Sequence, residues 1–140
     1  MGLKEHVEKS KILSDEELDA LKREPVSYEN TYNHLKSFIR YRFLIDDDEF
    51  WDDRIPKLAE YSIDRLLANI DENDSLGDLS MNCTGSSSAE TKYALLLITI
   101  RKRLGLTFAP VMAAELDTVP LLAEEVARQL AGIRAAAEPA

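Results

Sequence analysis

Three consecutive serines, Ser86 to Ser88, are the residues of this sequence whose type and spacing are best suited to chemistry. They lie shortly before a strongly apolar run, YALLLITI, at residues 93–100. A serine followed three residues later by glutamate, as in Ser87 and Glu90, is a capping box that opens a helix. One hydroxyl is therefore expected to cap a helix that begins near Ser88. A neighbouring hydroxyl would then be free to carry a chemical group.

The elements predicted around the serines place them at the amino end of a helix. Apolar residues at helical spacing predict one helix at about 54–70 and another from about Ser88 to Leu104, where Gly105 can cap it. Residues 71–85 form a long polar loop between the two. The linker that follows holds one short helical turn, and the last helix starts at Thr118-Val119-Pro120 with Leu122, Val126 and Leu130 inward.

The amino-terminal half also predicts helices. Ser14 and Glu17 form a capping box that opens a short helix, and Pro25 ends it. A longer helix is expected from about Tyr28 to Ile45, before the aspartates at 46–48. No run of alternating apolar and polar residues occurs in the chain, so the predicted fold class is all-α.

The order of these elements from residue 54 onward resembles the acyl and peptidyl carrier proteins, four-helix bundles that tether substrates on a phosphopantetheine arm. Residues 104–108, LGLTF, resemble the F-G-I-x-I exit from the family's second helix. Residues 117–119, DTV, resemble the T-T-V opening of its last helix. The resemblance implies a carrier-like four-helix bundle at 54–134, a helical extension at 1–53 and a disordered tail at 135–140.

The resemblance also implies an attachment site. The family's motif is G-x-D-S-L, and its match here is GSSSA at residues 85–89. Ser88 would carry the 4'-phosphopantetheine, with Ser87 and Ser86 less favoured, and Ser87 would take over the capping role of the family's aspartate. A helix start suits a phosphodiester because its free N–H groups and dipole favour negative charge.

Two other alignments can be drawn, of which the first remains open. Counting back from Leu104 without gaps puts Glu90 at the family's serine position, and this register predicts that Ala94, Leu96, Ile100 and Leu104 are buried. A third register puts Cys83 there, but it needs a still longer insertion, and we interpret it as a resemblance of the loop only. The D-S-L core is absent in every register, which leaves two hypotheses. Either the chain is a working carrier, served by a phosphopantetheinyl transferase and by acyl- or aminoacyl-loading enzymes, or it is a carrier-like binding module that has no prosthetic group.

The net charge and the composition limit the classes of partner that the chain is expected to bind. The 140 residues carry a net charge of −9, which should repel nucleic acid and anionic membranes and attract proteins with basic faces. A single cysteine allows no internal disulfide. We expect no signal peptide, because the first residues lack an apolar segment, and the longest apolar run is too short to span a bilayer. We therefore expect a cytoplasmic protein that binds neither nucleic acid nor membrane.

No arrangement of residues indicates an enzyme or a metal site. Ser88 and His34 could be combined with an aspartate into a triad, but no nucleophile elbow accompanies them. The acidic stretch at 46–53 and the segment that starts at Asp71 lack the glycine and glutamate of a calcium loop. We expect solvated linkers and helix caps there, with no catalytic residue and no metal ligand.

The remaining residues of interest are expected to have structural roles. The basic residues at 101–103 would interact favourably with the carboxyl end of their helix. The aromatic residues of the extension are expected to pack against the core, with a docking face or a homodimer contact as the alternative. These aromatic residues are Tyr32, Phe38, Phe43 and Trp51.

Overall fold

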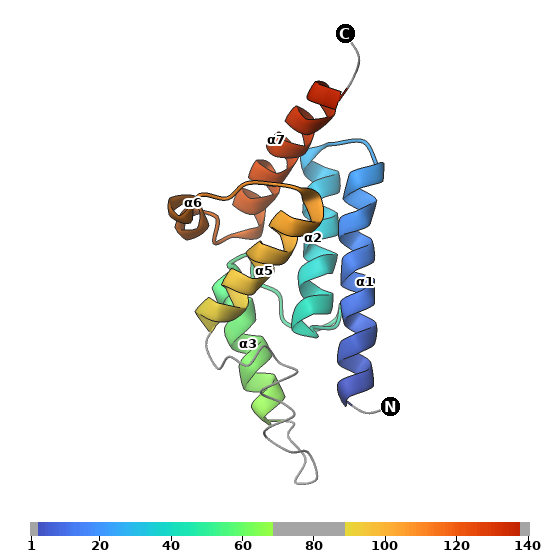
Figure 1. The fold of residues 1–140 in the computed structure, drawn as a ribbon. Helices are drawn as coiled ribbons and strands as arrows, with labels where there is room; N and C mark the ends of the chain where they lie inside the picture. Colours follow the sequence, from blue (N-terminus) through green and yellow to red (C-terminus); the bar gives the residue numbers. More distant parts are fainter. Residues whose placement is uncertain (1–2, 69–88, 138–140) are drawn as a thin grey trace.

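A computed structural model describes residues 3–68 and 89–137 of the chain, and Figure 1 shows their arrangement. No strand occurs in these two stretches, so the all-α fold class is confirmed for the part of the chain described. The helices are α1 (Leu3–Arg23), α2 (Tyr28–Phe43), α3 (Ile55–Ala68), α5 (Ala89–Leu104), α6 (Pro110–Glu115) and α7 (Val119–Ala137).

Helix α1 is one continuous helix, and the prediction that a short helix opens at Ser14 is wrong. Ser14 is fully buried in the middle of α1, and its hydroxyl donates to the carbonyl of Lys11 at 2.7 Å. Ser10, Ser14, Leu18 and Leu21 follow helical spacing, and all four are buried. Two of these buried residues are small and polar. The spacing of apolar residues alone therefore does not predict the first half of this helix.

Helices α1 and α2 lie side by side, joined by a short connection (Figure 1). Ser27 is the N-cap of α2, and its hydroxyl accepts a hydrogen bond from the Asn30 N–H at 3.0 Å. Leu44 adopts a left-handed conformation, with φ at 57°, and ends the helix. Helix α2 therefore stops two residues before the predicted end at Ile45.

One hydrophobic cluster joins residues from both predicted parts of the chain. Helix α7 packs on α2, and α5 packs on both α1 and α3. Phe38 and Phe43 are buried, and Tyr32 and Trp51 pack against the cluster, so their predicted packing role is confirmed. The division of the chain into an extension at 1–53 and a bundle at 54–134 stays a prediction. The fully buried side chains include Leu18, Leu35, Phe38, Ile39, Ile55, Leu58, Ile100, Val119, Leu122 and Val126.

Main-chain contacts fix the ends of the helices to one another. The starts of α3 and α7 are paired, because Ile55 N–H donates to the Asp117 carbonyl at 2.8 Å and Val119 N–H donates to the Asp53 carbonyl at 2.7 Å. Near the far end of α7, Arg134 donates to the carbonyls of Leu21 and Lys22 in the last turn of α1. These contacts satisfy groups that helix ends otherwise leave unpaired.

The carboxyl-terminal helices largely follow the prediction. Gly105 has φ at +69° after the last residue of α5, as expected of a helix-ending glycine. Helix α6 supplies the short turn in the linker, and Leu122, Val126 and Leu130 of α7 are buried as predicted. Helix α7 extends to Ala137, so residues 135–137 are helical although the sequence analysis placed them in a disordered tail.

Candidate functional site

The predicted attachment residues lie outside the described stretches. Ser86, Ser87, Ser88 and Cys83 belong to the segment between α3 and α5, as does the loop that starts at Asp71. The first described residue after this segment is Ala89, which is half-buried and is the first residue of α5. The surroundings of the amino end of α5 are therefore the part of the candidate site that the structure describes.

A buried lysine joins the amino-terminal turns of α5 to α3 and α2. Lys92 is only 6% exposed, and its Nζ donates to the Ser62 hydroxyl at 3.2 Å. Ser62 in turn donates to the Phe43 carbonyl at 2.7 Å, and the lysine nitrogen lies 5.2 Å from the centre of the Phe43 ring. A buried ammonium group is costly unless it has partners that stabilise its charge, and Lys92 finds them on α3 and at the end of α2. These contacts therefore hold the start of α5 in a defined position.

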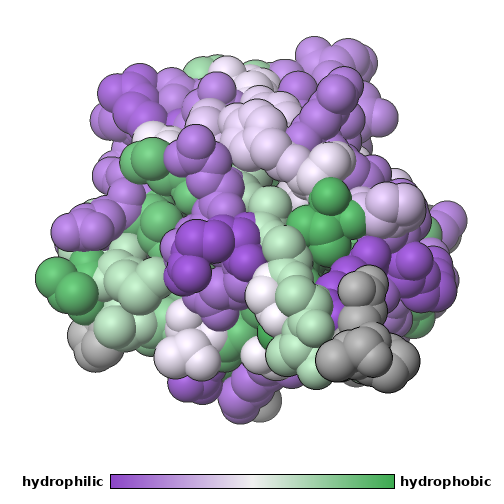
Figure 2. Space-filling model, turned by 90° about the horizontal axis from the view of Figure 1, so that it is seen from above, coloured by the Kyte–Doolittle hydropathy of each residue, from purple (hydrophilic) through white to green (hydrophobic). Residues whose placement is uncertain are grey.

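The outward face of α5 carries apolar residues followed by basic ones. Leu95 and Ile98 are 37% and 40% exposed, and Arg101 and Lys102 are also exposed. Arg103 contacts Asp19 of α1 with Nε at 3.1 Å and Nη2 at 3.0 Å, so its main role is to hold α1 against α5. In the view of Figure 2, apolar groups are interspersed with hydrophilic ones.

The burial pattern of α5 matches the ungapped register only in part. Leu96, Ile100 and Leu104 are buried as that register predicts, but Ala94 is exposed. Glu90, which that register places at the family's serine position, is exposed as well.

His34 is held by two carboxylates of α1 and of the connection that follows it. Its Nδ1 lies 2.6 Å from Glu17 and its Nε2 lies 3.0 Å from Glu24, so both ring nitrogens are occupied. Burial lowers the pKa of His34, but these two hydrogen bonds outweigh it and raise the pKa above its usual value. The ring is thus engaged in the contact between α1 and α2.

The acidic stretch at 46–53 is used in local contacts. Hydrogen bonds from Arg54 lower the pKa of Asp52 to about 2. Asp53 accepts from the Tyr32 hydroxyl at 2.8 Å and from the Trp51 ring nitrogen at 3.0 Å. Within residues 3–68 and 89–137, no group of three His, Cys, Asp or Glu side chains could hold a metal ion.

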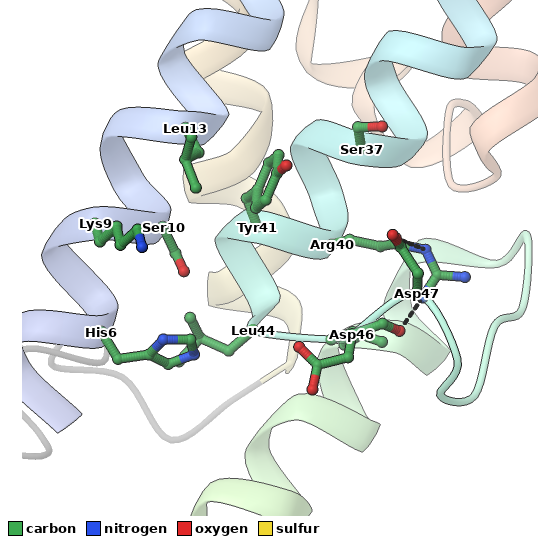
Figure 3. Close-up of a pocket in the computed structure, with 11 residues that line it drawn as sticks. His6, Lys9, Ser10, Leu13, Ser37, Arg40, Tyr41, Leu44, Asp46 and Asp47 are labelled. Carbon is green, nitrogen blue, oxygen red and sulfur yellow. Dashed lines mark hydrogen bonds and ion pairs between the residues drawn. The ribbon is translucent and has the colours of Figure 1, made fainter. Parts of the chain in front are cut away.

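A cavity between α1 and α2 is a feature that the sequence analysis missed. It lies near the carboxyl end of α2, has a volume of about 300 Å³ and is shown in Figure 3. Its polar lining includes His6, Lys9 and Ser10 of α1, and Asp46 just beyond α2. The spacing of His6, Lys9 and Ser10 would have placed them on one helix face, had α1 been predicted to extend that far.

Neither a family model, nor a curated protein, nor a solved structure matches this chain. The resemblance to carrier proteins therefore rests on the residues quoted above and stays a prediction. No helix in the described stretches is both long enough and apolar enough to cross a membrane.

Proposed function

We propose that the chain is a carrier-like protein that tethers an acyl or aminoacyl group as a thioester on a phosphopantetheine arm at Ser88. The observation that carries the proposal is the start of α5. Ala89 is the first described residue of α5, and Ser88 comes directly before it in the sequence. A phosphodiester at this point would benefit from the free N–H groups and the dipole of α5.

The order of the helices supports the same function. Helix α3, an intervening segment, α5, the short α6 and α7 follow one another in the order that the resemblance implies. The contact from Lys92 to Ser62 ties the first turns of α5, the helix that follows the serines in the sequence, to α3. In this function the chain performs no catalysis: the thiol of the arm holds the cargo, and the protein presents it to the loading enzymes.

Transfer of a fluorescent coenzyme A analogue by a broad-specificity phosphopantetheinyl transferase tests the proposal. We expect label on the full chain and on the Ser86→Ala and Ser87→Ala variants, which are the matched controls. The Ser88→Ala variant should take up no label. Equal labelling of Ser88→Ala, or absence of label from a folded wild-type chain, would contradict the assignment.

A second function is supported by the outward face of α5. Leu95 and Ile98 are exposed one turn apart, and Arg101 and Lys102 follow at helical spacing. Exposed apolar residues beside cations suit a protein–protein contact, as expected of a carrier-like module without an arm. Under this alternative, the serine variants would retain partner binding and Ile98→Glu would lose it.

Self-association and cellular location remain parts of the proposal. A homodimer through α1 and α2 is one way to use the exposed side chains of Ile12 and Tyr28. Sedimentation equilibrium of the full chain and of Ile12→Glu tests it, because a dimer contact there would weaken in the variant. The single cysteine, which allows no internal disulfide, favours a reducing compartment such as the cytoplasm.

A further inference from the structure

The cavity between α1 and α2 has walls of opposite charge. Figure 3 shows His6, Lys9 and Ser10 on one side, and Asp46 on the other, beyond the end of α2. Its volume of about 300 Å³ is at the small end of the range for ligand pockets, which suits a small molecule.

The α1 wall offers donors for an anionic group. Lys9 forms no ion pair with any residue of the described stretches, and its side chain is exposed at the cavity. Ser10 is only 6% exposed, and its hydroxyl bonds to no other residue in the part of the chain that the structure describes. Ser14, one turn further along the same buried stripe, uses its hydroxyl on the carbonyl of Lys11. The Ser10 hydroxyl is thus left to the cavity.

The opposite wall suits a cation. The carboxylate of Asp46 makes no ion pair or hydrogen bond within residues 3–68 and 89–137, and it lies beyond the carboxyl end of α2, where the helix dipole favours positive charge. Its main chain is held firmly, because its carbonyl accepts from Arg40 and from the Glu49 N–H, and its own N–H donates to the Glu49 carboxylate at 3.0 Å.

Arg40 does not alter this balance of charge. Its guanidinium bonds to the Asp46 carbonyl, lies 3.7 Å from the Asp47 carboxylate and stacks 4.9 Å from the centre of the Trp51 ring. It is therefore engaged in holding the segment after α2. Between the two charged walls, Leu13, Leu44 and Ile45 supply apolar surface.

We propose that this cavity binds a free amino acid with an apolar side chain. The carboxylate would lie near Lys9 and Ser10, the ammonium near Asp46, and the side chain against Leu13 and Leu44. A zwitterion matches both walls, whereas a ligand with one charge leaves the opposite wall unpaired. The proposal does not depend on Ser88 or on a phosphopantetheine arm.

The test is a titration of the ¹⁵N-labelled full chain followed by NMR, with L-leucine as the probe. Two analogues of the same shape, 4-methylpentanoate and 3-methylbutylamine, each carry one of its two charges. We expect saturable shifts at residues lining the cavity with leucine, and affinities about tenfold weaker for both analogues. No saturable shift with leucine, or equal affinity for 4-methylpentanoate, would overturn the proposal.

Single substitutions with matched controls test whether Lys9 and Asp46 are the charged groups that bind the ligand. Lys9→Met and Asp46→Asn should each weaken leucine binding about tenfold. Lys11→Met and Asp48→Asn remove the same charges from nearby exposed residues outside the cavity lining, and they should bind leucine like the wild type. Both wall positions are exposed, so the variants should fold. A control variant that weakens binding as much as its partner would reject the assignment.

Discussion

Gln129 of α7 pairs its side-chain amide with both main-chain groups of Thr107. Its Oε1 accepts from the Thr107 N–H at 2.9 Å, and its Nε2 donates to the Thr107 carbonyl at 2.8 Å. The side-chain amide thus makes the two hydrogen bonds that a neighbouring main chain would make with the linker that follows α5. The linker has no regular structure at this point, so these two bonds fix the path of the chain from α5 to α6.

Replacing Gln129 should therefore destabilise the fold. Gln129→Ala leaves both main-chain groups of Thr107 without this partner, and since water can replace it there, we expect a loss of about 0.5–1.5 kcal/mol in the free energy of unfolding. Thr107→Ala is the matched control, because the bonds use its main chain and its side chain is exposed. Urea denaturation measures both, and equal losses in the two variants would contradict this role.

The two glycines at 105 and 132 should respond to alanine in opposite directions. Gly105 has φ at +69°, where a side chain is strained, so Gly105→Ala should cost about 1 kcal/mol. Gly132 lies inside α7, and apart from its chain neighbours and the backbone of the helix no atom lies within 4 Å of an added Cβ, so Gly132→Ala should stabilise by about 0.5–1 kcal/mol. Thermal denaturation of both variants checks this, and a shift in the same direction would show that one assignment is wrong.

The pairing of Arg103 with Asp19 should hold α1 to α5 weakly and in a salt-dependent way. The pair is partly exposed, so Arg103→Ala should lose at most about 1 kcal/mol. Arg101 is exposed and forms no ion pair with the described residues, so Arg101→Ala serves as the control and should change little. Added salt should reduce the difference between the two variants. A difference that persists at high salt would point to packing instead of charge.

The contact of His34 with Glu17 and Glu24 predicts a dependence of stability on pH. Because the pKa of His34 is raised in the folded chain, protonation favours folding. The stabilisation is complete below the ordinary pKa of 6.5 and is lost as the pH rises through the higher folded-state value. The wild type should therefore exceed His34→Gln in stability by more in mildly acidic than in mildly alkaline buffer. A difference that does not vary with pH would contradict the prediction.

Most of the helices could be predicted because their buried residues are apolar and regularly spaced. Leu35, Phe38 and Ile39 mark α2, and Leu122, Val126 and Leu130 mark α7. The start of α1 could not be predicted, since Ser10 and Ser14 occupy its buried face where α2 packs against it. A capping-box pattern also occurs inside helices, and only the tertiary contact shows that Ser14 is internal.

The cavity could not be predicted for a different reason. Lys9 and Asp46 are far apart in the sequence, and the packing of α1 on α2 brings them to one place. For the serines, the sequence itself is the evidence, because they lie outside the described residues. The end of α5 is where the sequence analysis and the structure agree most closely, because Leu104 is the last helical residue in both.

The most direct test of the carrier assignment is the intact mass of the full chain after incubation with coenzyme A and a phosphopantetheinyl transferase. We predict a gain equal to one phosphopantetheine group on the wild type, and none on Ser88→Ala. No gain on a wild-type chain whose circular dichroism shows a folded, helical protein would contradict the assignment. The serines would then be a turn and a helix cap, and the outward face of α5 would be the surface to study.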